Sequence, residues 1–185
     1  MKAISLVVAV AVAAYALSIG ASAKEPSANH AINALPLRAT LEDGFRVEEG
    51  FFTVKIGGRS VLLQGLIVKQ ADAVGKLPIM LYTHGTTPSI HQRQAMTPRG
   101  VKNANLRIVR DYARRGWLGV FVLRRAYGQS DGPDPITGFK CDSSTPSFQD
   151  GIDAAADDLE ATLNYVGQRE DADPSRIMAF GVESS

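Results

Sequence analysis

Three segments of the sequence hold residue types that could catalyse a reaction or bind a ligand. The first is the turn around His84, Gly85 and Thr86, the second is the polar loop 124–132, and the third is the segment 181–185. A serine hydroxyl on a sharp turn after a strand can attack a carbonyl carbon. A loop that contains glycine can bring backbone N–H groups close to the oxyanion that forms. Gly85 and Thr86 are therefore candidate oxyanion-binding positions.

The segment 181–185 departs from the geometry that such a nucleophile requires, because small residues are needed two positions before and after it. Counting from Gly181 places the nucleophile at Glu183, which is a poor nucleophile at neutral pH. Counting from Ser184 instead places the β-branched Val182 where the turn requires a small residue. Ser184 is the candidate nucleophile and Glu183 occupies the expected position; a turn without a working nucleophile is the alternative.

A serine nucleophile also needs a base, and the sequence contains only three histidines, His30, His84 and His91. All three precede the segment 181–185, whereas the acid and the histidine follow the nucleophile in this type of site. We interpret His84 as a loop-shaping residue rather than a general base. The expected catalytic acid and histidine are therefore absent from this chain.

Other chemistries lack their characteristic residues. No C-x-x-C, H-E-x-x-H, Walker or G-x-G-x-x-G pattern occurs, so neither a metal nor a cofactor is expected. The adjacent Arg124 and Arg125 are interpreted as solvated, with anion binding as a weak alternative. Four acidic residues on an expected helix are interpreted as a solvated surface: Asp153, Asp157, Asp158 and Glu160.

Residues 1–23 have the pattern of a secretory signal peptide: Lys2, an apolar run, and small residues that end at Ala23. The run is short for a membrane span, so an uncleaved anchor is the less favoured alternative. We expect export to the periplasm or the extracellular space, with no membrane attachment after cleavage. Of the 20 basic residues Lys2 lies in this leader, which leaves 19 against 19 acidic residues, so nucleic acid is not an expected partner. A single cysteine, Cys141, excludes an internal disulfide.

The segment 24–44 is expected to be a tether, and the folded domain is expected over 45–185. Its first two strands are predicted to be antiparallel and joined at Gly57-Gly58. Short apolar runs then predict parallel strands, and helical spacing predicts helices between them. The strands are expected at 45–56, 60–69, 78–82, 117–123 and 177–180, and the helices at 103–115 and 148–166. This order predicts an α/β fold, in which ligands bind beyond the carboxyl ends of the parallel strands.

The order of several features along the chain resembles that of a known family. These features are the leader, the His84-Gly85 turn, the loop from Arg124 to Ser130, Cys141 and the segment 175–182. Together they resemble exported α/β-hydrolases related to dienelactone hydrolases and to acyl-peptide-cleaving serine hydrolases. The resemblance covers residues 45–182 and implies the N-terminal half of an α/β-hydrolase fold, truncated at the turn that carries the nucleophile.

The resemblance also implies a function. Full-length relatives would hydrolyse a small-molecule carboxylic ester or amide through a serine acyl-enzyme, without a cofactor. The chain alone is expected to be inactive; a noncatalytic binding module or remnant on the same sheet is the alternative, and a half-site completed by another chain is a further one. The strand 177–180 would then lack its next neighbour and form an apolar sheet edge, which could mediate self-association.

Overall fold

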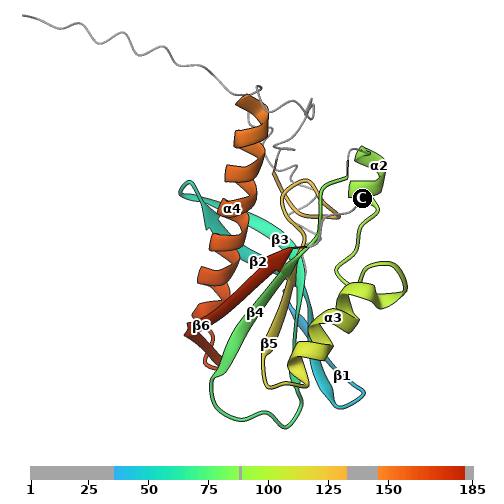
Figure 1. Ribbon diagram of the computed structural model, residues 1–185, viewed down its shortest axis with the longest axis vertical. Coiled ribbons are helices and arrows are strands. Elements are labelled where there is room, and N and C mark those ends of the chain that lie inside the picture. Colours follow the sequence, from blue (N-terminus) through green and yellow to red (C-terminus); the bar gives the residue numbers. More distant parts are fainter. Residues whose placement is uncertain (1–35, 88, 133–145, 182–185) are drawn as a thin grey trace, which may run out of the picture.

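The computed structural model describes residues 36–87, 89–132 and 146–181, with the backbone alone for 146–148 (Figure 1). These residues form one six-stranded sheet in the order β1-β2-β3-β5-β4-β6. The strands are β1 Arg38–Glu42, β2 Phe45–Ile56, β3 Arg59–Gln70, β4 Leu77–Thr83, β5 Leu118–Val122 and β6 Ala172–Gly181. The helices are α2 Ile90–Gln94, the 3-10 turn η1 Val101–Asn103, α3 Ala104–Ala113 and α4 Pro146–Gly167.

A long antiparallel hairpin follows β1, and its two strands and turn are those that the sequence predicts. β2 and β3 pair antiparallel along their whole length, from Phe45 opposite Gln70 to Ile56 opposite Arg59. The turn consists of Gly57 and Gly58, whose φ angles of 55° and 79° lie in the left-handed region that favours glycine. This turn chemistry fixes the hairpin's register.

The parallel part of the sheet contains the three predicted apolar strands. β4 lies between β5 and β6 and runs parallel to both. β5 also pairs antiparallel with β3, so the strand that follows β4 in the chain inserts between β3 and β4. All five residues of β5 are buried, as expected for a strand covered on both faces.

Two hydrophobic clusters lie on opposite faces of the sheet, because successive side chains of a strand alternate between the faces. One cluster joins α3, through Leu106 and Val109, to the sheet, and the other joins α4, through Ala161 and Val166, to the opposite face. Figure 1 shows α3 and α4 on the two sides of the sheet. Gly119 of β5 permits the close approach of α3, because a Cβ there would lie 2.7 Å from the carbonyl oxygen of Val109.

The folded part begins earlier than the sequence indicates. The expected tether 24–44 contains β1, which pairs antiparallel with β2. β1 is almost entirely exposed and lacks the alternation that identifies a half-buried strand. Ion pairs from Arg99 and Arg110 to Glu42 hold it, and these contacts come from residues far along the chain. Residues 24–35 of that segment, and the expected leader 1–23, lie outside the described residues. Among those described, no helix is long and apolar enough to span a membrane.

Candidate functional site

The carboxyl ends of β4, β5 and β6 meet at one end of the sheet. Thr83 is the register partner of both Val122 and Gly181, so the chain leaves all three strands at the same level. The loops that begin at His84 and Arg124 therefore start beside Gly181, the last described residue of β6 (Figure 1). The segment that follows, with the candidate residues Glu183 and Ser184, lies outside the described residues.

His84 is buried and both nitrogens of its ring are engaged by the backbone. Nδ1 lies 2.7 Å from the carbonyl oxygen of Gly85, to which it donates, and Nε2 accepts the backbone N–H of Arg124 at 3.2 Å. Burial and the Arg124 guanidinium lower the pKa of His84 from 6.5 to about 3. The imidazole is therefore neutral near pH 7 and has no nitrogen left to take a proton from a nucleophile. This geometry matches a loop-shaping role.

Arg124 orients the backbone of the loop after β4. Its Nη2 lies 3.1 Å from the carbonyl oxygen of His84, 3.3 Å from that of Gly85 and 3.5 Å from Oγ1 of Thr86. In a trans peptide the C=O and the following N–H point in opposite directions. The described chain contains no cis peptide bond. The N–H groups of Gly85 and Thr86 are consequently directed away from Arg124, and they belong to half-buried residues.

Arg125 ties the loop after β5 to α4, and this contact corrects the expectation of two solvated arginines. Its Nε and backbone N–H donate to the carboxylate of Asp158 at 2.6 and 2.8 Å, and its Nη2 donates to the carbonyl oxygen of Ala154 at 2.8 Å. The Asp158 side chain is only 1% exposed, so its assignment to a solvated surface is wrong. The three other acidic residues of that group are exposed as expected: Asp153, Asp157 and Glu160.

The rest of the polar loop is attached to β3. Ser130 donates to the carbonyl oxygen of Leu123 at 2.7 Å and accepts the backbone N–H of Gln64 at 2.9 Å. Asp131 extends the pairing by exchanging hydrogen bonds with the backbone of Leu62. The chain turns here at Gly128, whose φ of 57° suits glycine. These hydrogen bonds thus hold the described loop 124–132 against the sheet. No local sequence signal distinguishes a loop with this structural role from a ligand-binding loop.

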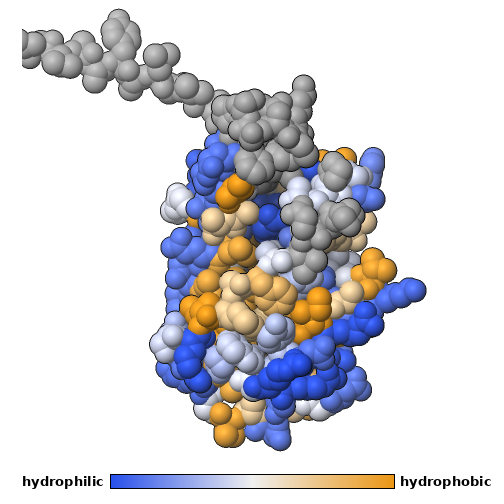
Figure 2. Space-filling model, in the orientation of Figure 1, coloured by the Kyte–Doolittle hydropathy of each residue, from blue (hydrophilic) through white to orange (hydrophobic). Residues whose placement is uncertain are grey.

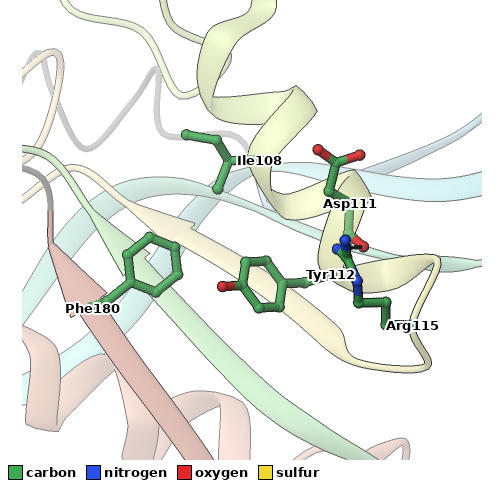
Figure 3. A pocket seen from close by; sticks show the side chains of 5 residues that line it. All are labelled: Ile108, Asp111, Tyr112, Arg115 and Phe180. Atoms are coloured by element: carbon green, nitrogen blue, oxygen red, sulfur yellow. Dashed lines mark hydrogen bonds between the residues drawn. The ribbon is translucent and has the colours of Figure 1, made fainter.

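An open hollow on the α3 side of the sheet includes Phe180, the residue before the end of β6. It has a volume of about 460 Å³ between α3 and β6 and is lined by Ile108, Asp111, Tyr112, Arg115 and Phe180 (Figure 3). Neither this hollow nor a smaller one of about 190 Å³ beside α4 includes Gly85 or Thr86. Within the described residues, no group of three or more metal-ligating side chains comes together.

The comparisons with known proteins give structural likeness alone. No protein-family model matches the sequence, and the search of curated proteins finds no relative. A candidate acetyl xylan esterase from Bacteroides fragilis is matched over 80% of this chain and 41% of its own, with a TM-score of 0.51 and 14% identity. A hypothetical protein from Pseudomonas aeruginosa is matched over 78% and 40%, with a TM-score of 0.50 and 14% identity.

The chain spans about two fifths of the length of each of these two structures. Their identity to this chain is low, so the likeness concerns the fold and not the activity. The strand order, the antiparallel hairpin and the helices on both faces agree with it. The described residues form part of an α/β-hydrolase fold.

Proposed function

We propose that the chain is the N-terminal part of an exported serine hydrolase, in the branch related to dienelactone hydrolases. The register of β4 and β6 is the observation that supports this proposal most. It brings the exit of β6 at Gly181 next to the loop that starts at His84. A nucleophile a few residues beyond Gly181 would lie close to the N–H groups of Gly85 and Thr86.

The proposed reaction is acyl transfer from a carboxylic ester or amide. The Ser184 hydroxyl attacks the carbonyl carbon while a histidine takes its proton, and the carbonyl oxygen becomes an oxyanion. The N–H groups of Gly85 and Thr86 donate to that oxyanion. Collapse of the intermediate releases the alcohol or amine, which takes the proton from the histidine, and water then hydrolyses the acyl-serine. The histidine and the acid that orients it belong to polypeptide other than the described residues.

This assignment explains why the 185-residue chain is expected to lack turnover by itself. His84 directly precedes the proposed oxyanion-binding residues, but its two nitrogens are occupied by the backbone and its pKa is about 3. A serine without a base within hydrogen-bond reach has little nucleophilicity. Because one of the two structures with a similar fold carries the name of an acetyl xylan esterase, acetyl esters are the first substrates to test.

The experiment compares the 185-residue chain with a polypeptide extended by the coding sequence downstream of codon 185. We expect no hydrolysis of p-nitrophenyl acetate by the chain, and hydrolysis by the extended polypeptide that Ser184→Ala abolishes and Glu183→Ala preserves. Hydrolysis that survives Ser184→Ala would overturn the assignment. Absence of a hydrolase-like continuation in every frame would also overturn it. Ester binding without turnover in the extended polypeptide would favour the noncatalytic module instead.

A further inference from the structure

The short helix α2 is attached to the molecule through a buried arginine. Among its five residues, Ile90–Gln94, Arg93 is the one that is buried, with 5% of its surface exposed. Figure 2 shows apolar side chains gathered across the middle of this face, below the place that α2 occupies in Figure 1. A helix of this length is not stable by itself. The side chain of Arg93 is therefore the main attachment of α2.

The same side chain holds the far end of the loop 84–87, which leaves β4. Its Nε donates to the carbonyl oxygen of Thr87 at 2.5 Å. The next residue in the sequence is Pro88, so this peptide group has no N–H and its carbonyl oxygen is its one polar atom. Arg124 donates to carbonyl oxygens at the near end of the loop. The two arginines thus hold the loop 84–87 from both ends, with the candidate oxyanion-binding residues between them.

Arg93 also connects this loop to the loop after β5. Its guanidinium carbon lies 5.7 Å from the ring centroid of Tyr127, and that of Arg124 lies 5.4 Å from the same centroid, within the range of a cation–π contact. Tyr127 is 2% exposed, and its ring centroid lies 4.1 Å from that of His84. The backbone N–H of Gly128 donates to the carbonyl oxygen of Arg93 at 2.8 Å. The loop after β5 therefore supports Arg93 from the side of the sheet.

We propose that Arg93 is a positioning residue of the proposed active site. Its hydrogen bond to Thr87 keeps the loop 84–87 in the conformation that directs the N–H groups of Gly85 and Thr86 toward the oxyanion. Arg93 acts through the backbone and does not contact the substrate. Its effect on the rate rests on the proposed function, whereas its effect on the loop does not. Because the oxyanion forms in the transition state, a loosened loop should lower kcat more than it raises KM.

Two substitutions separate the hydrogen bond from the charge. A glutamine side chain carries its amide nitrogen as many bonds from Cα as the Nε of arginine, and methionine carries a methyl group there. Arg93→Gln therefore keeps a donor for the carbonyl oxygen of Thr87, whereas Arg93→Met does not. Both variants lose the guanidinium and its other contacts equally, and the helix propensities of the two residues are similar. Gln94→Met, at an exposed residue of the same helix, is the control for methionine itself.

The first measurement is backbone ¹⁵N relaxation of Thr86 and Thr87 in the 185-residue chain, which requires no catalysis. We expect order parameters of about 0.85 in the wild type, in Arg93→Gln and in Gln94→Met, and below about 0.6 in Arg93→Met. Val120, in the buried centre of β5, is the reference for an intact fold and should keep its value in every variant. Equal order parameters in Arg93→Gln and Arg93→Met, or a mobile loop in Arg93→Gln, would overturn the proposal.

The second measurement is hydrolysis of p-nitrophenyl acetate by the extended polypeptide. Arg93→Met should lower kcat about tenfold with KM changed by less than about twofold, and Arg93→Gln should keep kcat within about threefold of the wild type. An equal loss of kcat in the two variants would overturn the role of the hydrogen bond in the reaction. Absence of turnover by the wild-type extended polypeptide would instead contradict the proposed function, and the order parameters would still decide whether Arg93 positions the loop.

Discussion

The two ends of the sheet use half-buried arginines in opposite ways. Where β6 begins, Arg169 donates to the carboxylates of Glu48 and Asp171 at 2.8–3.2 Å, and Lys69 completes the cluster. Where β6 ends, Arg124 donates to backbone carbonyls instead. The first arrangement neutralises charge and joins β2, β3 and β6. The second fixes which way peptide groups point, which an ion pair between side chains does not do.

The two arrangements have different consequences: the ion pairs of Arg169 contribute to stability, and the hydrogen bonds of Arg124 preorganise a loop. Ion pairs at the first end link the β2–β3 hairpin to the start of β6, which pairs through the backbone with neither strand of that hairpin. At the other end, Arg125 and Asp158 anchor the loop that carries Arg124, and Arg124 in turn orients the loop after β4. A chain of contacts therefore runs from α4 to the proposed oxyanion-binding N–H groups, and its members can be removed one at a time.

Loss of the Asp158 anchor should have the largest effect. Asp158→Ala leaves the Arg125 guanidinium, whose side chain is 15% exposed, with only the exposed Asp157 carboxylate at 3.7 Å as an ion-pair partner. Removing one partner of a buried ion pair costs about 3–5 kcal/mol. We expect Asp158→Ala to lower the free energy of unfolding, measured in urea, by about 3 kcal/mol. Asp153→Ala, on the exposed face of the same helix, is the control and should change it by less than about 0.5 kcal/mol. Equal effects would contradict the anchor.

Disrupting the Arg169 cluster, at the other end of the sheet, should have the next largest effect on stability. Arg169→Met removes the cation that two largely buried carboxylates share, and we expect a loss of about 2 kcal/mol in the same measurement. Arg46 offers a matched control, because it contacts the same Glu48 at 2.8 Å with a side chain that is 48% exposed. Arg46→Met should cost at most about 1 kcal/mol. A larger loss from Arg46→Met than from Arg169→Met would reverse the ranking.

The stability contributions of the two ends should also begin to fall at different pH values on acidification. His84 has a folded pKa of about 3 against 6.5, so below pH 6.5 the unfolded chain binds a proton that the folded chain does not. Stability should therefore fall by about 1 kcal/mol per pH unit on acidification below pH 6.5, and His84→Asn should flatten this slope in urea unfolding measured across pH 4–7.

At the other end, hydrogen bonds from Arg169 and Lys69 overcome burial and lower the pKa of Asp171 from 3.8 to about 2. Its contribution is complete above pH 4 and is lost as the pH falls toward 2. Asp171→Asn should flatten the stability curve only in this lower window. A change above pH 5 would contradict the separation of the two ends.

Arg124 should have the smallest effect on global stability and a local effect on exchange. Arg124→Met removes the donor to the carbonyl oxygens of His84 and Gly85, so this loop should open more often. We expect amide hydrogen exchange at Gly85 and Thr86 to accelerate about tenfold, equivalent to about 1.4 kcal/mol of local opening, with the centre of β5 unchanged. Arg107→Met, at an exposed residue of α3, should leave both amides unaffected.

Sequence patterns predict the elements of this fold better than their arrangement. The apolar runs at 78–82, 117–123 and 177–180 correspond to β4, β5 and β6. β4 and β5 are largely buried, as such runs predict, whereas residues 177–181 of β6 are exposed or half-buried. β1 has no such signature, since ion pairs from distant arginines hold it. The insertion of β5 between β3 and β4 likewise leaves no local signature, because it depends on how the chain crosses over the sheet and not on the residues of any one segment.

The sequence likewise predicts one part of the candidate site and not the other. The turn at Gly85 and Thr86 is visible in the sequence because it follows an apolar strand. The roles of Arg124, Arg125 and Asp158 are not visible, since a charged residue in a loop or on a helix has the same local pattern whether it is solvated or buried with a partner. The nucleophile position, at Glu183 or Ser184, stays a prediction.

The strand order also determines how long each strand waits for its pairing partners during translation. β4 leaves the ribosome directly after the β2–β3 hairpin, yet it pairs with neither of those strands. Its partners β5 and β6 are translated later, β5 after α2 and α3 and β6 after α4 as well. During that delay an apolar strand with two unpaired sides is exposed in the nascent chain, which makes it a binding segment for chaperones and a starting point for aggregation. Slowing translation after Thr83 should therefore lower the soluble yield.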